Sequence, residues 1–209
     1  ALQKADSIGC YGSEFDVWIA KDNKLIVNHD PVYKMRPMEY SKGDALTGLK
    51  LSNGENLPSL KQYLEAGKKC DTQLKLKAHS TKKRETKAVQ EIVAMVKSMG
   101  LENRMEYITF SLHAMKEFIR LAPTGTPVFY LNGDLSPEEL KELGAAGFDY
   151  HMGVIKKHPE WIKEAHDLGM KVNVWTVDEA EDMKWLIEHK ADFITTNEPI
   201  VLQKELKQQ

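Results

Sequence analysis

The sequence predicts an α/β fold with a parallel sheet, because short strand-like segments alternate with helix-like segments along its 209 residues. Each strand candidate is short and rich in β-branched or aromatic residues. The regular alternation fits a closed (β/α)8 TIM barrel better than an open doubly wound sheet, since no glycine-rich phosphate-binding turn occurs. The strand candidates are residues 13–19, 72–78, 105–110, 127–131, 148–152, 171–176 and 192–196.

The size of the chain suits a single domain. A hydrophobic content of 42% is enough for one sizeable core, and no linker is visible, so we expect one barrel domain over residues 1–209. Seven strand candidates leave an eight-stranded barrel one strand short. Because the chain opens at Ala1 in a helix-like pattern, we expect that the first strand and the natural N-terminus are missing from it.

The first strand candidate, 13–19, is followed by a turn at 21–24 and an apolar run at 25–27 that returns along it. After the return, residues 30–57 contain repeated proline and glycine, which predicts a loop excursion.

Helix signals follow between the later strands. Residues 83–99 place apolar side chains on one helical face and end before Gly100. Ser136–Glu139 has the serine, proline and glutamate of a capped helix start, and Asp178–Glu181 resembles another start. Residues 155–168 are amphipathic.

Charge and composition exclude several partners. The net charge of −2 and the pI near 6.4 give no support for nucleic-acid binding or for a membrane surface. No apolar run approaches the length of a membrane span. Cys10 and Cys70 are too few for a disulfide framework, and we expect two buried, inert thiols. Compartment and oligomeric state are left open.

The most informative residues are two carboxylates and a histidine. Glu14 and Asp16 are two apart in the first strand candidate, so their side chains share one face. Paired carboxylates suit a hard divalent cation, Ca²⁺ or Mg²⁺. The returning strand then delivers His29, a candidate general acid/base. A lone pair of this kind is usually a solvated strand face, but the histidine in register favours a metal-assisted acid/base site.

An ordered set of motifs resembles the glycerophosphodiester phosphodiesterase family. The family has an E-x-D-V strand, a T-K-D-G turn and an H-D-P strand end, later followed by V-x-V-W-T-V and G-A-D-x-I-I-T-D-x-P. The matching segments here are Glu14–Val17, Lys21-Asp22, His29–Pro31, Val172–Val177 and Ala191–Pro199.

The resemblance implies a phospholipase-C-like TIM barrel that hydrolyses small-molecule glycerophosphodiesters to glycerol phosphate and an alcohol. Glu14 and Asp16 would hold the cation, and His29 would protonate the leaving alkoxide. Lys77 would contact the phosphate, and Trp175 would form an apolar wall of the pocket.

One departure from the family concerns Lys75, which stands where the family has a third metal carboxylate. Lys75 and Lys77 share one strand face, so Lys75 could take the place of the cation, pair with Glu14 and Asp16, and contribute to substrate binding. Two hypotheses therefore stay open. One is a metal-assisted hydrolase, and the other is a metal-independent or inactive relative that binds a phosphate-bearing ligand.

Overall fold

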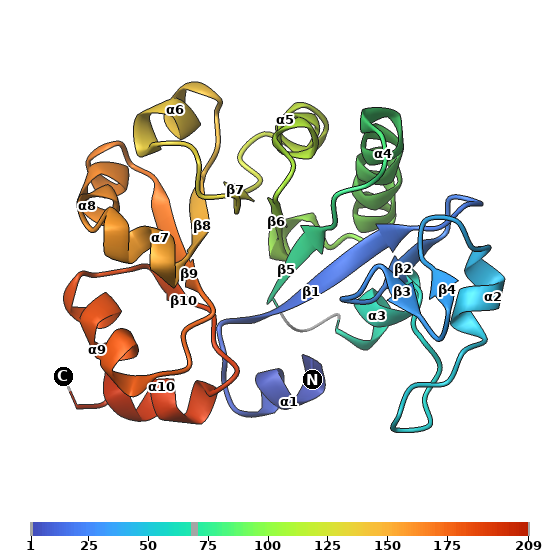
Figure 1. The fold of residues 1–209 in the computed structure, drawn as a ribbon, viewed down its shortest axis with the longest axis horizontal. Coiled ribbons are helices and arrows are strands. Elements are labelled where there is room, and N and C mark those ends of the chain that lie inside the picture. The colour runs from blue at the N-terminus through green and yellow to red at the C-terminus, as the bar shows by residue number, and fades with distance from the viewer. Residues whose placement is uncertain (1, 68–70, 209) are drawn as a thin grey trace. The chain divides into compact units, whose positions relative to one another are not determined.

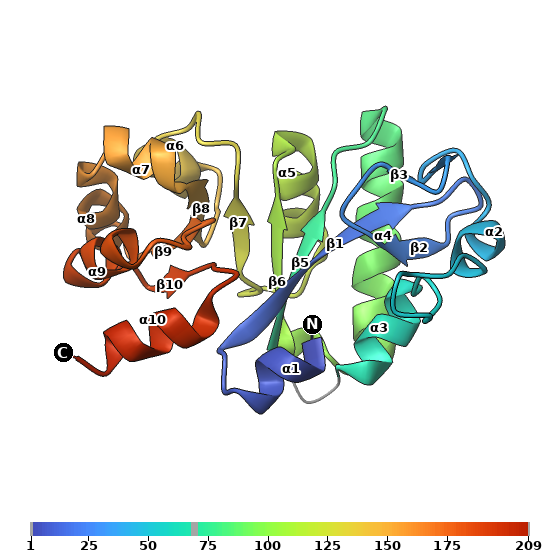
Figure 2. The same ribbon diagram turned by 60° about the horizontal axis from the view of Figure 1, so that its bottom comes forward.

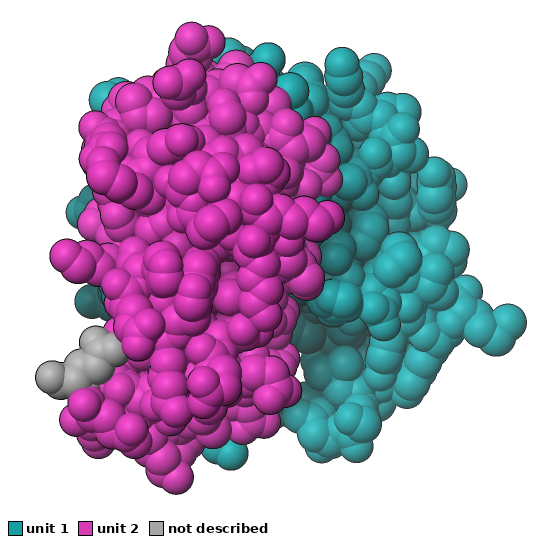
Figure 3. Space-filling view, turned by 60° about the vertical axis from the view of Figure 1, so that its left-hand side comes forward, with its two compact units in different colours: residues 1–126 teal, residues 127–209 magenta. Residues whose placement is uncertain are grey.

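The computed structural model describes residues 2–67 and 71–208, and the chain divides into two units, residues 1–126 and 127–209 (Figure 3). Strands and helices alternate in both units, as the predicted α/β class requires (Figure 1). The expectation of a single domain over the whole chain stays a prediction.

Unit 1 contains the first three strands that the sequence predicts. Its main sheet has the order β2-β1-β5-β6. The strands are β1 (Gly12–Ile19), β2 (Leu25–Val27), β5 (Asp71–Leu76) and β6 (Met105–Thr109). β1, β5 and β6 run parallel, whereas β2 returns antiparallel to β1.

The two faces of the unit 1 sheet differ because side chains alternate along each strand. One face is apolar and covered by helices. Phe15 of β1 lies 4.5 Å from the ring of Tyr63, and Tyr107 of β6 stacks on Phe118 at 4.3 Å. The other face therefore carries the remaining side chains of these strands, the charged ones among them. The covering helices are α3 (Leu60–Ala66), α4 (Lys82–Ser98) and α5 (Leu112–Leu121), seen beside the sheet in Figure 2.

The expected loop excursion contains secondary structure, which corrects the sequence interpretation. β3 (Val32–Tyr33) and β4 (Arg36–Pro37) form a hairpin, and α2 (Gly43–Thr47) follows it. The hairpin turns at Lys34 and Met35, both with positive φ (45° and 61°). Neither is the glycine or asparagine that usually signals such a turn, so the sequence did not reveal it. The unit also contains the helices α1 (Leu2–Ser7) and η1 (Glu102–Arg104).

Unit 2 has a parallel sheet with the order β10-β9-β8-β7. Its core consists of strand and helix side chains such as Phe148, Val172 and Leu186. The strands are β7 (Val128–Tyr130), β8 (Gly147–His151), β9 (Lys171–Trp175) and β10 (Phe193–Ile194). The helices are α6 (Pro137–Glu142), α7 (Met152–Lys157), α8 (Glu160–Asp167), α9 (Ala180–Glu188) and α10 (Pro199–Leu206).

The helix predictions mostly match the structure. α4 ends before Gly100, whose φ of 66° suits a glycine after a helix. The capping box at Ser136 is present, with both of its reciprocal hydrogen bonds. The amphipathic stretch 155–168 is divided between α7 and α8 at Pro159, because proline lacks an N–H and disfavours helical backbone before it. Asp178 does not cap α9 and instead accepts hydrogen bonds from Thr196 and Asn197.

Candidate active site

Four of the predicted site residues meet on the charged face of the unit 1 sheet. The Lys75 Nζ lies 3.0 Å from Glu14 Oε1 and 3.0 Å from Asp16 Oδ1. The Lys77 Nζ lies 3.5 Å from the same Asp16 oxygen. We call these four side chains the ion-pair cluster. It holds two carboxylates and two ammonium groups, so its charges balance.

Strand register explains why these residues meet. In the parallel pairing of β1 and β5, Asp16 is directly opposite Lys75. Lys77 follows the end of β5, but its N–H donates to the Val17 carbonyl at 3.1 Å and extends the pairing. Glu14 and Lys77 therefore lie on the same face as Asp16 and Lys75, each two residues along its strand.

Burial makes the cluster electrostatically strong. The Asp16 side chain is 8% exposed and that of Lys75 is 14% exposed, so water screens their attraction only partly. Burial alone would lower the pKa of Lys75, but the charges of Glu14 and Asp16 raise it above its ordinary value. Lys75 therefore stays protonated. Burial raises the pKa of Glu14, and the Lys75 charge opposes this shift without cancelling it.

His29 lies in the turn that follows β2. The N–H of the preceding residue, Asn28, donates to the Asp16 carbonyl at 3.1 Å, which anchors the start of this turn to β1. The His29 side chain is 75% exposed, and its Nδ1 is 2.8 Å from Asp30 Oδ1. If the carboxylate accepts from Nδ1–H, the other ring nitrogen is left for proton exchange.

A second polar group on the same face was missed in the sequence. Gln73 Nε2 donates to Glu106 Oε2 at 2.8 Å, and the Tyr11 hydroxyl donates to Glu106 Oε1 at 3.1 Å. Burial, reinforced by the Glu106 charge, raises the pKa of Tyr11 to about 12, so its hydroxyl stays protonated. The signal was present, since Gln73 and Glu106 are polar residues inside apolar strands. Their partnership depends on β5 and β6 being neighbours, which the sequence does not state.

His79 has a structural role at the ends of two strands. Its Nδ1 lies 2.7 Å from the Lys77 carbonyl, and its Nε2 accepts from the Ile19 N–H at 3.0 Å. Both ring nitrogens are thus engaged, which requires the neutral ring with the proton on Nδ1. Burial lowers the pKa of His79 and favours this neutral form. His79 joins the ends of β1 and β5.

Trp175 belongs to unit 2, at the carboxyl end of β9. Its indole N–H donates to the Asp149 carbonyl at 2.8 Å, which fixes the ring while leaving it partly exposed. The His151 ring meets it edge-on at 5.0 Å. A fixed aromatic ring at a strand end can form an apolar wall, the role expected of Trp175, and that role stays a prediction.

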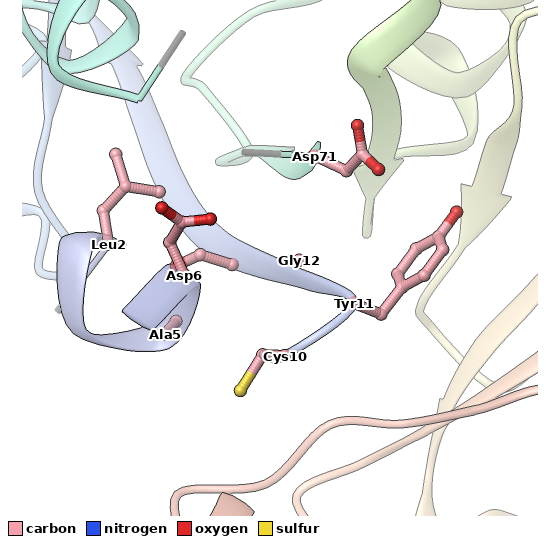
Figure 4. Close-up of a pocket in the computed structure, with 8 residues that line it drawn as sticks. Leu2, Ala5, Asp6, Cys10, Tyr11, Gly12 and Asp71 are labelled. Carbon is pink, nitrogen blue, oxygen red and sulfur yellow. The ribbon is translucent and has the colours of Figure 1, made fainter. Parts of the chain in front are cut away.

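A separate pocket of about 180 Å³ lies at the amino end of β1 and is lined in part by α1 (Figure 4). None of the six predicted site residues lines it. Cys10 contributes to it and is only half-buried, so the expectation of a buried thiol is wrong for this residue. Cys70 lies outside the described residues. The pocket is distinct from the ion-pair cluster.

Comparison with known proteins identifies the fold class of this protein. A crystal structure of a glycerophosphodiester phosphodiesterase from Parabacteroides distasonis is 47% identical, with a TM-score of 0.96 over 99% of this chain and 87% of that one. This likeness, with the strand and helix order above, confirms the predicted α/β (β/α)8 TIM-barrel class.

A family model described as the glycerophosphoryl diester phosphodiesterase family matches residues 1–201. The chain belongs to this family, as its motifs indicated.

Two further relatives extend the comparison. A protein named glycerophosphodiester phosphodiesterase from Caldanaerobacter subterraneus is 25% identical, over 97% of this chain and 88% of its own length. A phosphodiesterase from Oleispira antarctica, solved with its product sn-glycerol-3-phosphate, has the same fold. Its TM-score is 0.77 at 17% identity, covering 98% of this chain and 88% of that one.

Members of this family are typically metal-dependent, and Glu14 and Asp16 of the ion-pair cluster are the residues that would hold a divalent cation. Ca²⁺ takes six or more oxygen ligands, and Mg²⁺ requires near-octahedral oxygen coordination. Here the two carboxylate oxygens both face the Lys75 ammonium group. Across residues 2–67 and 71–208, no group of three or more His, Cys, Asp or Glu side chains could hold a metal ion. The cluster does not fit a divalent cation.

In the part of the chain that the structure covers, no helix is both long and apolar enough to cross a bilayer.

Proposed function

We propose that this protein hydrolyses glycerophosphodiesters to glycerol phosphate and an alcohol, with the ion-pair cluster binding the phosphate. The observation that carries this proposal is the meeting of Glu14, Asp16, Lys75 and Lys77 on one sheet face in a member of this family. Two lysines next to two carboxylates give donors for phosphate oxygens without a large net charge. The product bound by the Oleispira relative supports the substrate class.

Each residue has a role in this proposal. Lys77 binds the phosphate as a point charge, and its ion pair with Asp16 orients it. Lys75 adds a second positive charge and holds Glu14 in place. His29 donates a proton to the leaving oxygen, while Asp30 fixes its Nδ1. Trp175 supplies an apolar surface for the alcohol part of the substrate.

The test is release of sn-glycerol 3-phosphate from glycerophosphocholine, comparing the wild type with His29→Ala. Loss of a general acid should lower kcat by about 10²- to 10⁴-fold. His158→Ala is the matched control, because His158 is a partly exposed histidine in unit 2 that pairs with Glu160. Equal rates for the wild type and His29→Ala would remove His29 from the mechanism.

A second candidate function is binding of a phosphate-bearing ligand without hydrolysis. The position of Lys75 between the two carboxylates favours it, because an altered charge set can preserve binding while turnover is lost. This candidate predicts that the wild type binds sn-glycerol 3-phosphate in a calorimetric titration and releases none from glycerophosphocholine. Lys77→Met should abolish that binding. Turnover by the wild type would exclude this candidate.

A further inference from the structure

The position of Lys75 is set by its neighbours on three strands. It lies on β5, between β1 and β6 in the sheet order. Gln73 precedes Lys75 on this face of β5, and its side chain donates a hydrogen bond to Glu106 of β6. On the β1 side, Glu14 and Asp16 each approach its Nζ to 3.0 Å. The ammonium group therefore lies between the two carboxylates.

Among the described residues, the charges that face these two carboxylate oxygens are the ammonium group of Lys75 and, for Asp16, also that of Lys77. Glu14 Oε1 and Asp16 Oδ1 are both buried, and within the described chain neither accepts a well-aligned hydrogen bond. The contact of each of these oxygens with Lys75 Nζ is an attraction between opposite charges at close range. Two buried anionic oxygens that converge on one point form a cradle for a positive charge, and in this chain the ammonium group of Lys75 provides it.

The charges of the two lysines match what a divalent metal ion would bring to this site. Lys75 and Lys77 together carry the same positive charge as one divalent ion, and both lie beside Asp16. A divalent ion added to this cluster would meet two ammonium groups at short range, in a site that water screens poorly. Lys75 and a bound divalent ion therefore exclude each other as long as Lys75 stays between the carboxylates.

We propose that Lys75 is the built-in cation of this site, that it occupies the position of a divalent metal ion on Glu14 and Asp16, and that phosphate binding here is independent of divalent metal. This inference rests on the proposed function for the phosphate ligand alone. The part that concerns the cation does not depend on turnover. It also predicts that removing Lys75 creates a metal site.

The first experiment measures thermal melting with increasing CaCl₂ or MgCl₂. Lys75→Glu places a third carboxylate beside the other two, and its melting temperature should rise by about 5 °C or more at saturating cation, because a bound ion stabilises the folded state. The wild type should show no shift. Lys61→Glu is the matched control, since Lys61 is exposed on α3 and the substitution changes charge equally.

A second variant guards against failure of Lys75→Glu to fold. Lys75→Gln removes the ammonium group without adding a carboxylate, and we expect it to gain a smaller cation-dependent shift than Lys75→Glu. A shift of the wild type as large as that of the variants would overturn the proposal. So would the absence of any shift in every folded Lys75 variant, because Lys75 would then not be what excludes the ion.

The second experiment titrates the wild type with sn-glycerol 3-phosphate by calorimetry, with and without EDTA. The proposal predicts the same Kd in both, whereas a tenfold or greater loss of affinity with EDTA would overturn it. If the wild type binds no phosphate ligand at all, the proposed function fails. The melting experiment still decides whether Lys75 excludes the ion, because it requires neither ligand nor turnover.

Discussion

The two faces of strand β5 show how one six-residue segment serves both stability and chemistry. On the helix-covered face, Leu74 and Leu76 are fully buried among apolar side chains. On the opposite face, Gln73 and Lys75 each make contacts with acidic residues on a neighbouring strand. Burial of the apolar face stabilises the fold whichever apolar side chains pack against it. The charged face instead needs oppositely charged or hydrogen-bonding side chains at specific positions.

This difference means that substitutions on the two faces should have separable consequences. A cavity on the apolar face should lower the free energy of unfolding and leave ligand binding intact. A charge removed from the other face should alter ligand or ion binding, with a smaller effect on stability, because the side chains of the ion-pair cluster retain some exposure.

The largest effect is expected for Leu76→Ala on the apolar face. Leu76 is 0% exposed, and removing its buried methyl groups should cost about 2–5 kcal/mol of unfolding free energy. Denaturant unfolding measures this, with Leu206→Ala, at an exposed leucine, as the control. Affinity for sn-glycerol 3-phosphate should stay the same under conditions where the variant is folded. A tenfold loss of affinity would show that the two faces are not independent.

A smaller loss is expected for Asp16→Asn on the charged face. Asp16 faces both Lys75 and Lys77. The change therefore leaves Lys75 paired with Glu14 alone and removes the carboxylate that faces Lys77. We expect a cost of about 1–3 kcal/mol, since a buried charge loses its partner. Asp44→Asn is the control, because Asp44 pairs with Lys24 at the surface, where such pairs contribute little. Equal stability of the two variants would contradict a buried cluster.

The sequence predicted both faces of β5 because a strand alternates its side chains with a period of two. That rule placed Lys75 and Lys77 together, and the neighbouring strand with the same alternation supplied Glu14 and Asp16. Strand bounds were correct to within one or two residues at most positions, since the strands are short, apolar runs with clear ends.

Apart from the pairing of Lys75 with Glu14 and Asp16, which the family resemblance implied, the sequence could not supply contacts that depend on the order of strands or on loop geometry. The link from Gln73 to Glu106 requires β5 and β6 to be adjacent, and the two hydrogen bonds of His79 require the ends of β1 and β5 to meet. The hairpin at Lys34 and Met35 has no glycine to mark it. The roles assigned to His29 and Trp175 stay predictions.

The smallest effect concerns pH and the carboxyl group of Glu14. Burial raises its pKa above the ordinary 4.5, and it faces Asp16, Lys75 and Lys77. The folded state therefore binds a proton more tightly than the unfolded state, and the free energy of unfolding should fall as pH rises above about 4.5 towards the raised pKa.

Glu14→Gln should lose this pH dependence, because the amide does not titrate. The slope that separates wild type from variant cannot exceed about 1.4 kcal/mol per pH unit, the limit for a single proton. Urea unfolding of both proteins at several pH values from 4 to 8 measures the difference, in which the titrations of all other groups largely cancel. Parallel curves would mean that Glu14 is as accessible to water as a surface carboxylate, and the charged face of the unit 1 sheet would then be a solvated surface and not a buried site.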